Sequence, residues 1–135
     1  MGALKRLKEI CGFKVAAHTY ESGEIEKKTG IVVDTLLKDG DMLPYCGGIK
    51  VIHIPGHTRG NISLFLKEKK TIIAGDSLKT EEGKLIPPPE MYCEDTEMAR
   101  KELRRLLNLD FEKILVSHGN DVYDRGKEKL IALLK

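Results

Sequence analysis

The sequence predicts an α/β domain in which helices cover a mostly antiparallel or mixed β-sheet. Two observations support this fold class. Amphipathic helical patterns stand at the start and in the last third of the chain, and short apolar runs of strand length lie between them. The 135 residues, 41% of them hydrophobic, form no internal repeat and no linker, and they suffice for one core. We therefore expect a single domain over residues 1–135.

The first third of the chain predicts a helix followed by short strands. Ala3, Leu7 and Ile10 recur at helical spacing and Gly12 follows as a stop signal, so we expect a helix over residues 3–11. The next segments are expected to be, in order, a buried strand at 13–17, a loop or short helix at 21–30, a strand edge at 31–34 and a turn at 39–41.

Apolar runs in the middle and at the end of the chain predict the main sheet and two more helices. Strands are expected at 49–54, 62–66, 71–74 and 113–116, with residues 67–70 joining two of them as a hairpin and 85–89 as an extended, proline-ended loop. A helix follows, capped by Asp95 or Thr96. The last helix is expected to place Tyr123, Leu130, Ile131 and Leu134 on one stripe, with Asp121 and Asp124 as its N-cap residues.

Composition narrows the classes of function. The net charge of +2 arises from basic and acidic residues mixed along the chain, which gives no support to a nucleic-acid partner. No window approaches the roughly 20 apolar residues of a membrane span, and the start has no apolar signal region. Cys11, Cys46 and Cys93 lie too far apart for a metal pair, and we expect them to be small, buried or half-buried side chains of a cytoplasmic protein.

Three strands each end in a side chain that can bind a metal. His57 follows the 49–54 strand in Pro-Gly-His-Thr-Arg-Gly, Asp76 follows the 71–74 strand in Gly-Asp-Ser, and His118 follows the 113–116 strand in Ser-His-Gly. Imidazole and carboxylate are the ligands expected for zinc, and for iron or manganese in similar geometries. Loops at one end of a sheet often build such a site, because the strands fix the bases of the loops.

These three words, in this order and spacing, resemble the third, fourth and fifth motifs of the metallo-β-lactamase superfamily. Lys38-Asp39-Gly40-Asp41, placed before a Gly-Gly pair and the strand that leads to His57, is similar to the usual lead-in of that family. The resemblance runs through essentially the whole chain. It implies an αββα sandwich, of which this chain would hold the C-terminal half and part of the N-terminal half, and a metal-dependent hydrolase.

The resemblance also implies roles for the three residues. His57 would complete one metal site, His118 the other, and Asp76 would bridge them. The family motif His-x-His-x-Asp-His, which supplies the remaining ligands, is absent from this sequence, although residues 1–7 resemble the segment that follows it. Two explanations stay open: the natural protein starts further upstream and is an active hydrolase, or the gene is truncated and its product is a non-catalytic binding or assembly module.

The missing motif sets further expectations for this chain. Three protein ligands are too few for a tight dinuclear centre, so we expect weak, mononuclear binding of zinc, iron or manganese at His57, Asp76 and His118. A sheet face left uncovered should promote self-association. His53, Thr58 and Ser77 are candidate hydrogen-bond partners that orient the ligands, whereas His18 is expected to be a structural residue. We expect the substrate to be a small molecule, and no sequence motif in residues 81–95 identifies it.

Overall fold

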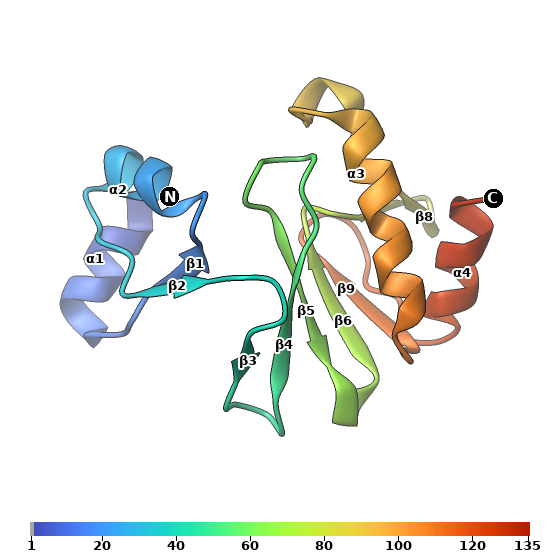
Figure 1. The fold of residues 1–135 in the computed structure, drawn as a ribbon, viewed down its shortest axis with the longest axis horizontal. Coiled ribbons are helices and arrows are strands. Elements are labelled where there is room, and N and C mark those ends of the chain that lie inside the picture. Colours follow the sequence, from blue (N-terminus) through green and yellow to red (C-terminus); the bar gives the residue numbers. More distant parts are fainter. Residues whose placement is uncertain (1) are drawn as a thin grey trace.

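The computed structural model describes residues 2–135, and its first part forms a small lobe beside the main sheet (Figure 1). The lobe contains two helices and two short strands: α1 (Gly2–Cys11), β1 (Ala16–His18), α2 (Ser22–Thr29) and β2 (Thr35–Leu37). β1 and β2 pair in parallel, with Ala17 opposite Leu36. The buried residues of this lobe are few: Ala17, His18, Ile31, Val33 and Leu37.

The rest of the chain is built on a five-stranded mixed sheet in the order β3-β4-β5-β6-β9. Its strands are β3 (Met42–Leu43), β4 (Ile49–His53), β5 (Ile62–Leu66), β6 (Thr71–Gly75) and β9 (Lys113–Val116). Neighbours are antiparallel except β6 and β9, which are parallel. The prediction of a mixed sheet is therefore confirmed, and β6 and β9 end at the same edge.

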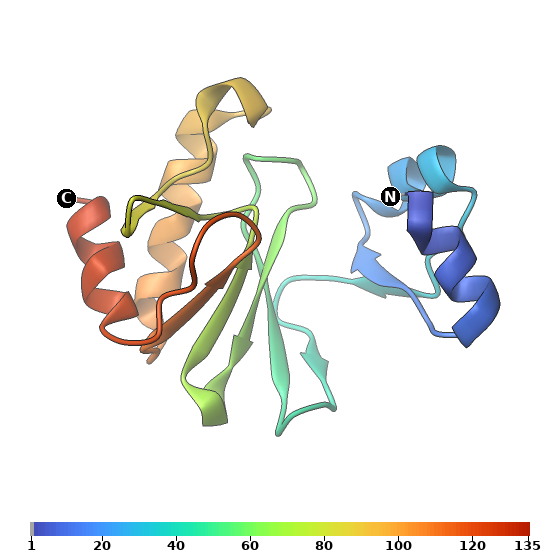
Figure 2. The same cartoon turned by 180° about the vertical axis from the view of Figure 1, so that it is seen from behind.

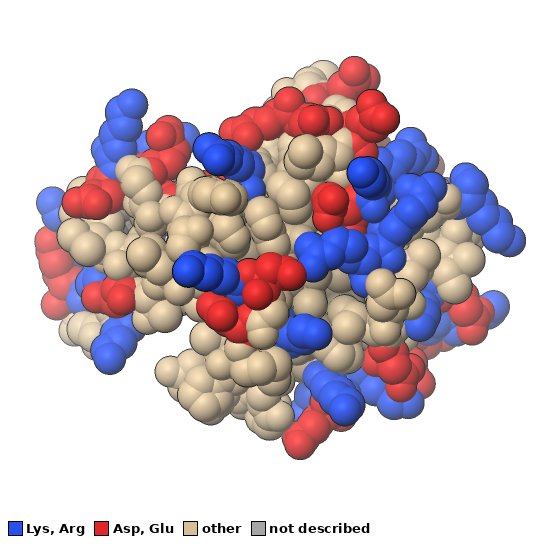
Figure 3. Space-filling view, in the orientation of Figure 1, with Lys and Arg blue, Asp and Glu red and all other residues tan. Residues whose placement is uncertain are grey.

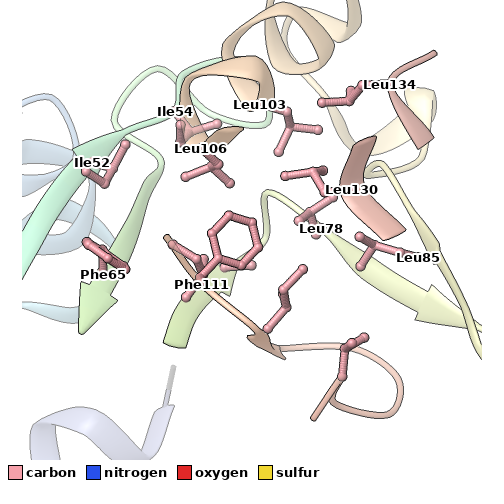
Figure 4. Close-up of a cluster of buried hydrophobic side chains, with 14 residues drawn as sticks. Ile52, Ile54, Phe65, Leu78, Leu85, Leu103, Leu106, Phe111, Leu130 and Leu134 are labelled. Carbon is pink, nitrogen blue, oxygen red and sulfur yellow. The ribbon is translucent and has the colours of Figure 1, made fainter. Parts of the chain in front are cut away.

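Helices cover one face of this sheet. α3 (Thr96–Glu102) continues into the 3-10 helix η3 (Leu103–Asn108), and α4 (Gly126–Leu133) lies next to them (Figures 1 and 2). Asp95 accepts a hydrogen bond from the Met98 amide, which confirms it as the N-cap of α3. The core between helices and sheet contains Ile54, Ile72, Leu103, Leu106, Phe111, Ile114 and Leu130, with others of the same cluster (Figure 4).

The opposite face of the sheet carries an aliphatic row. Val51, Leu64, Ile73 and Leu115 lie side by side across four strands, because each is the register partner of the next. Val51 is buried, whereas the other three are only half-buried. This face of the sheet is therefore only partly covered in the described chain.

A separate hairpin follows β6 along the chain and precedes α3. β7 (Lys79–Glu81) and β8 (Lys84–Ile86) pair antiparallel, and they precede the short 3-10 helix η2 (Glu90–Tyr92). The prediction of a plain extended loop over 85–89 is therefore wrong for its first two residues. Glu82 and Gly83 form the turn, both with positive φ (49° and 77°), as a tight hairpin turn requires.

Several other expectations need correction. The strands predicted at 13–17 and 31–34 are displaced to 16–18 and 35–37, because the parallel pairing selects those residues. Tyr123 lies outside α4 and is exposed. The residue at the N-cap of α4 is Arg125, whose side chain donates to Glu128 and makes no capping hydrogen bond. Asp121 instead accepts from the Val116 amide.

The surface shows a mixture of charges. Acidic side chains gather above the start of α3, and blue and red side chains interleave over the rest of the face in Figure 3. Cys11 and Cys46 are exposed rather than buried, and Cys93 is half-buried as expected; all three are free thiols. Across residues 2–135, no helix has the length and apolar character needed to cross a bilayer.

Candidate metal centre

His57 stands on a loop that is pressed against α3. The loop follows β4, and the amides of Glu94 and Asp95 donate to the carbonyls of His57 and Gly56 at 3.1 and 2.8 Å. Gly56 is buried with a φ of 135°, and a Cβ there would lie 2.3 Å from the Ala99 backbone. Only glycine allows this close approach, so the sequence word Pro-Gly-His has a packing reason as well as a chemical one.

The structure brings the three predicted ligands together. Nε2 of His57 lies 3.6 Å from Oδ2 of Asp76, and Nε2 of His118 lies 3.5 Å from Oδ1 of the same carboxylate. The parallel pairing of β6 with β9 explains the second contact, since Asp76 and His118 follow the adjacent ends of these strands. Each imidazole thus faces a different oxygen of one carboxylate.

The two imidazoles differ in environment. The side chain of His118 is 75% exposed, whereas that of His57 is only 21% exposed. Nδ1 of His57 is buried and has no hydrogen-bond partner among the described residues. A buried polar atom without a partner is uncommon and costs about 1–3 kcal/mol, so the position of this ring needs a reason beyond packing.

These donors suit a divalent cation, although their arrangement is not closed. Two nitrogen donors and a carboxylate are the chemistry that zinc, iron and manganese accept. Within residues 2–135, however, no group of three His, Cys, Asp or Glu side chains already surrounds one point closely enough to hold an ion. The residues therefore fit such an ion by type and proximity, and small movements of the side chains would be needed to bind it.

A cavity of about 570 Å³ opens over the three side chains. Its other walls are mainly apolar and come from the β7–β8 hairpin and the segment after it: Leu78, Lys79, Pro88, Pro89 and Tyr92. Lys79 is the one basic side chain among the residues that line this cavity in the described chain, and its Nζ also lies 3.3 Å from Glu81. The predicted site is thus a pocket of small-molecule size rather than a flat surface.

Asn61 ties the two ligand loops together, and sequence reasoning missed it. Its side-chain amide donates to the Ile54 carbonyl at 2.9 Å and to the Ser77 hydroxyl at 2.7 Å. Ser77 in turn lies 3.0 Å from the hydroxyl of buried Ser63. The hydrogen bonds therefore connect the loop of His57 with the residue next to Asp76.

The three candidate orienting residues have different positions. Ser77 takes part in the link just described. His53 lies away from the core face that holds Ile52 and Ile54, as predicted, but its ring bonds to the Arg59 carbonyl and not to a ligand. Thr58 contributes its backbone carbonyl to the turn, accepting from the Gly56 and Asn61 amides. Within residues 2–135, none of the three hydrogen-bonds to His57, Asp76 or His118.

A family model described as the metallo-beta-lactamase superfamily matches residues 1–118 of this sequence. The chain belongs to this superfamily. The predicted family is confirmed, and the match reaches His118, the last of the three expected ligands.

Curated members of the superfamily are similar to parts of the chain. The probable metallo-hydrolase YflN of Bacillus subtilis is 34% identical over 98 residues, which are 64% of this chain and 37% of that protein. The hydroxyacylglutathione hydrolase of Brucella anthropi is 40% identical over 47 residues, which are 34% of this chain and 18% of that protein. The chain thus matches well under half the length of either relative.

Solved structures of the superfamily confirm the fold. The protein ST1585 from Sulfolobus tokodaii matches with a TM-score of 0.68 at 19% identity, over 99% of this chain and 61% of that one. A metallo-beta-lactamase from Pontibacter korlensis matches with a TM-score of 0.76 at 16% identity, over 96% and 61%. TTHA1623, solved in a di-iron-bound form, matches with a TM-score of 0.66 at 23% identity, over 90% and 65%. The chain therefore has part of the superfamily sandwich, as predicted.

Proposed function

We propose that the chain carries part of the active site of a metal-dependent hydrolase, with His57, Asp76 and His118 as metal ligands. One observation carries the proposal: two imidazole Nε2 atoms face the two oxygens of a single carboxylate at 3.5 and 3.6 Å. The membership of the superfamily and the similarity to a probable metallo-hydrolase support it.

The ligand types narrow the cofactor to zinc, iron or manganese. When bound, such a cation lowers the pKa of a water molecule and polarises a carbonyl or phosphoryl group. His57 Nε2, His118 Nε2 and the Asp76 carboxylate would hold it. Because this chain provides only these three ligands, we expect one weakly held ion per chain.

The cavity suggests the kind of substrate that the hydrolase accepts. Leu78, Pro88, Pro89 and Tyr92 offer apolar surface, and Lys79, whose side chain is 26% exposed, adds a positive charge. An ester, thioester or lactone with an apolar body and a nearby anionic group would match these walls. The prolines fix their own φ angles, which reduces the flexibility of this side of the cavity.

Metal titration tests the proposed ligands. After dialysis against a chelator, calorimetry with Zn²⁺ and Mn²⁺ should show weak binding of one ion to the intact chain. His57→Ala and Asp76→Asn should lower the affinity for the metal ion at least tenfold, because each removes one of three ligands. Asp124→Asn, which changes an exposed carboxylate, should leave the affinity unaltered. Equal binding by all four proteins, or none by the intact chain, would contradict the assignment.

Activity separates a hydrolase from a non-catalytic module. Metal-dependent turnover of neutral and anionic esters, thioesters, lactones or phosphodiesters that disappears in His57→Ala supports a hydrolase. Metal binding without turnover of any of these substrates supports a binding or assembly module instead.

A further inference from the structure

The backbone of Arg59 and Gly60, just beyond His57, is held by a set of contacts that includes the small N-terminal lobe. The Gly60 amide donates to Oε1 of Glu21 at 2.9 Å. The His53 Nε2 bonds to the Arg59 carbonyl at 2.8 Å. The Arg59 guanidinium lies 4.3 Å from the centre of the Tyr20 ring. Three contacts therefore fix two successive residues of the ligand loop.

The contact between Gly60 and Glu21 is tight. Gly60 is buried, and a Cβ added there would lie 2.4 Å from Cγ of Glu21 and 3.0 Å from its backbone nitrogen. Glu21 is itself fixed, since its amide donates to the His18 carbonyl at 2.9 Å and it occupies the N-cap position of α2. A carboxylate that accepts a backbone N–H makes a stronger hydrogen bond than a neutral acceptor does.

The His53 ring is held on its face as well as at Nε2. It stacks on the ring of His18, with centroids 4.1 Å apart and planes 18° from parallel. His18 is 5% exposed, and its Nδ1 accepts from the Tyr20 amide at 3.1 Å. Because a carbonyl can only accept, the proton of His53 resides on Nε2. The lobe therefore determines the orientation of His53 through His18.

We infer that Glu21 and His53 are positioning residues for His57, and that the N-terminal lobe acts on the metal site through them. Both act on Arg59–Gly60, and the turn that includes these residues fixes the direction in which His57 points. The effect on metal binding rests on the proposed function. The clamp, by which we mean the hydrogen bonds of Glu21 and His53 to Gly60 and Arg59, does not depend on it.

Substitutions at Glu21 test the inference. Glu21→Ala removes the acceptor for the Gly60 amide, and Glu21→Gln restores a neutral acceptor of similar length. Glu24→Ala is the matched control, because Glu24 lies on the same helix and its exposed side chain pairs only with Lys28 at 3.2 Å among the described residues. Amide hydrogen exchange of Gly60 reports the clamp directly, and exchange at Ile72 and Ile114 reports the core.

In Glu21→Ala we expect Gly60 to exchange at least tenfold faster while the core amides keep their rates. The affinity for Zn²⁺ should fall about tenfold, at the low end of the 10- to 100-fold range for residues that orient metal ligands. Glu21→Gln should recover most of both effects, and Glu24→Ala should show neither.

The outcomes separate the inference from the proposed function. Unchanged exchange at Gly60 in Glu21→Ala overturns the clamp. Faster exchange with unaltered Zn²⁺ affinity overturns the positioning role. If the intact chain binds no Zn²⁺, the proposed function fails, and the NMR shift of the His57 ring decides the inference: a change in Glu21→Ala supports it, and an unchanged shift overturns it.

Discussion

The ring of His57 has two nitrogen atoms, but only one of them has a polar neighbour among the described residues. Nε2 faces Asp76, while Nδ1 is buried with no partner among the described residues. A structural histidine would normally have both nitrogens hydrogen-bonded or exposed to water. The contrast with His18 is clear, since the Nδ1 of that ring accepts from a backbone amide. The incomplete partners of His57 agree with a residue selected for ligand binding.

Protonation of His18 should make stability depend on pH. Burial lowers the pKa of His18 below its ordinary 6.5, and the neighbouring His53 lowers it further, although Glu21 and Asp39 oppose both effects. The unfolded chain therefore takes up a proton near pH 6.5 while the folded chain stays neutral at this position. The free energy of unfolding should decrease as the pH falls from 6.5 toward the lower folded-state pKa, and this contribution should then level off.

Urea unfolding between pH 8 and pH 5 measures this effect. His18→Gln should be less stable at pH 8, because it loses the stack on His53, but its stability should fall less steeply below pH 6.5. Parallel curves for the two proteins would show that His18 does not contribute to the pH dependence.

At the scale of elements, hydrophobic pattern alone locates four of the five strands of the main sheet, and only the two-residue β3 was not predicted. The runs at 49–54, 62–66, 71–74 and 113–116 agree with β4, β5, β6 and β9 to within one residue. These strands are apolar on both faces, so their pattern is strong. β7 and β8 were not predicted, because each has only three residues: β7 is the polar run Lys-Thr-Glu, and β8 is Lys-Leu-Ile directly before the prolines.

Some residues of the candidate site could likewise be predicted from the sequence, and others could not. The three predicted ligands follow strong strands and lie in short sequence motifs, and the structure places their side chains close together. Asn61, Glu21 and His18 lie in no such motif. Their roles depend on contacts with residues 16 to 39 positions away, namely Asn61 with Ser77, Glu21 with Gly60 and His18 with His53, which no local pattern encodes. The distance from Glu21 to Gly60 alone is 39 residues along the chain.

The junction between the His57 loop and α3 should be sensitive to a single methyl group. Gly56→Ala places a Cβ 2.3 Å from the Ala99 backbone, at a φ of 135° that alanine disfavours. We expect a loss of about 2–4 kcal/mol in the free energy of unfolding, from overpacking and backbone strain together. Urea unfolding measures it.

Gly23→Ala in α2 is the matched control for this change. A Cβ at Gly23 meets no atom within 4 Å, and its helical position should make alanine stabilising by about 0.5–1 kcal/mol. Equal effects of the two substitutions would show that the contact with Ala99 does not limit the loop.

At the scale of the whole molecule, the sheet has one covered and one open face. The helices bury the first, while Leu64, Ile73 and Leu115 on the second stay half-buried. Two superfamily structures that align with almost all of this chain are about 1.6 times as long as it is. The chain covers 61% of ST1585 and 61% of the Pontibacter enzyme. A single domain over 1–135 stays a prediction.

The open face should lead this chain to self-associate. Light scattering over a range of concentrations should show an apparent mass that rises above 15.1 kDa. Leu115→Lys should reduce this association, because a charge in the aliphatic row opposes its burial. Ile131→Lys, at a 40% exposed position on α4, should leave it unaltered. A constant monomer mass for the unsubstituted chain would refute the prediction.

Because β6 and β9 pair in parallel, one part of the chain positions Asp76 and His118 and another part lines the cavity. Asp76 and His118 follow neighbouring strand ends, yet 41 residues lie between them. These residues form the β7–β8 hairpin, the proline segment, α3 with η3, and β9 itself. The segment between them that lines the cavity can therefore change in length or sequence while β6 and β9 keep their register. Under the proposed function, exchange of residues 79–92 should alter which molecules the cavity accepts while Asp76 and His118 keep their positions.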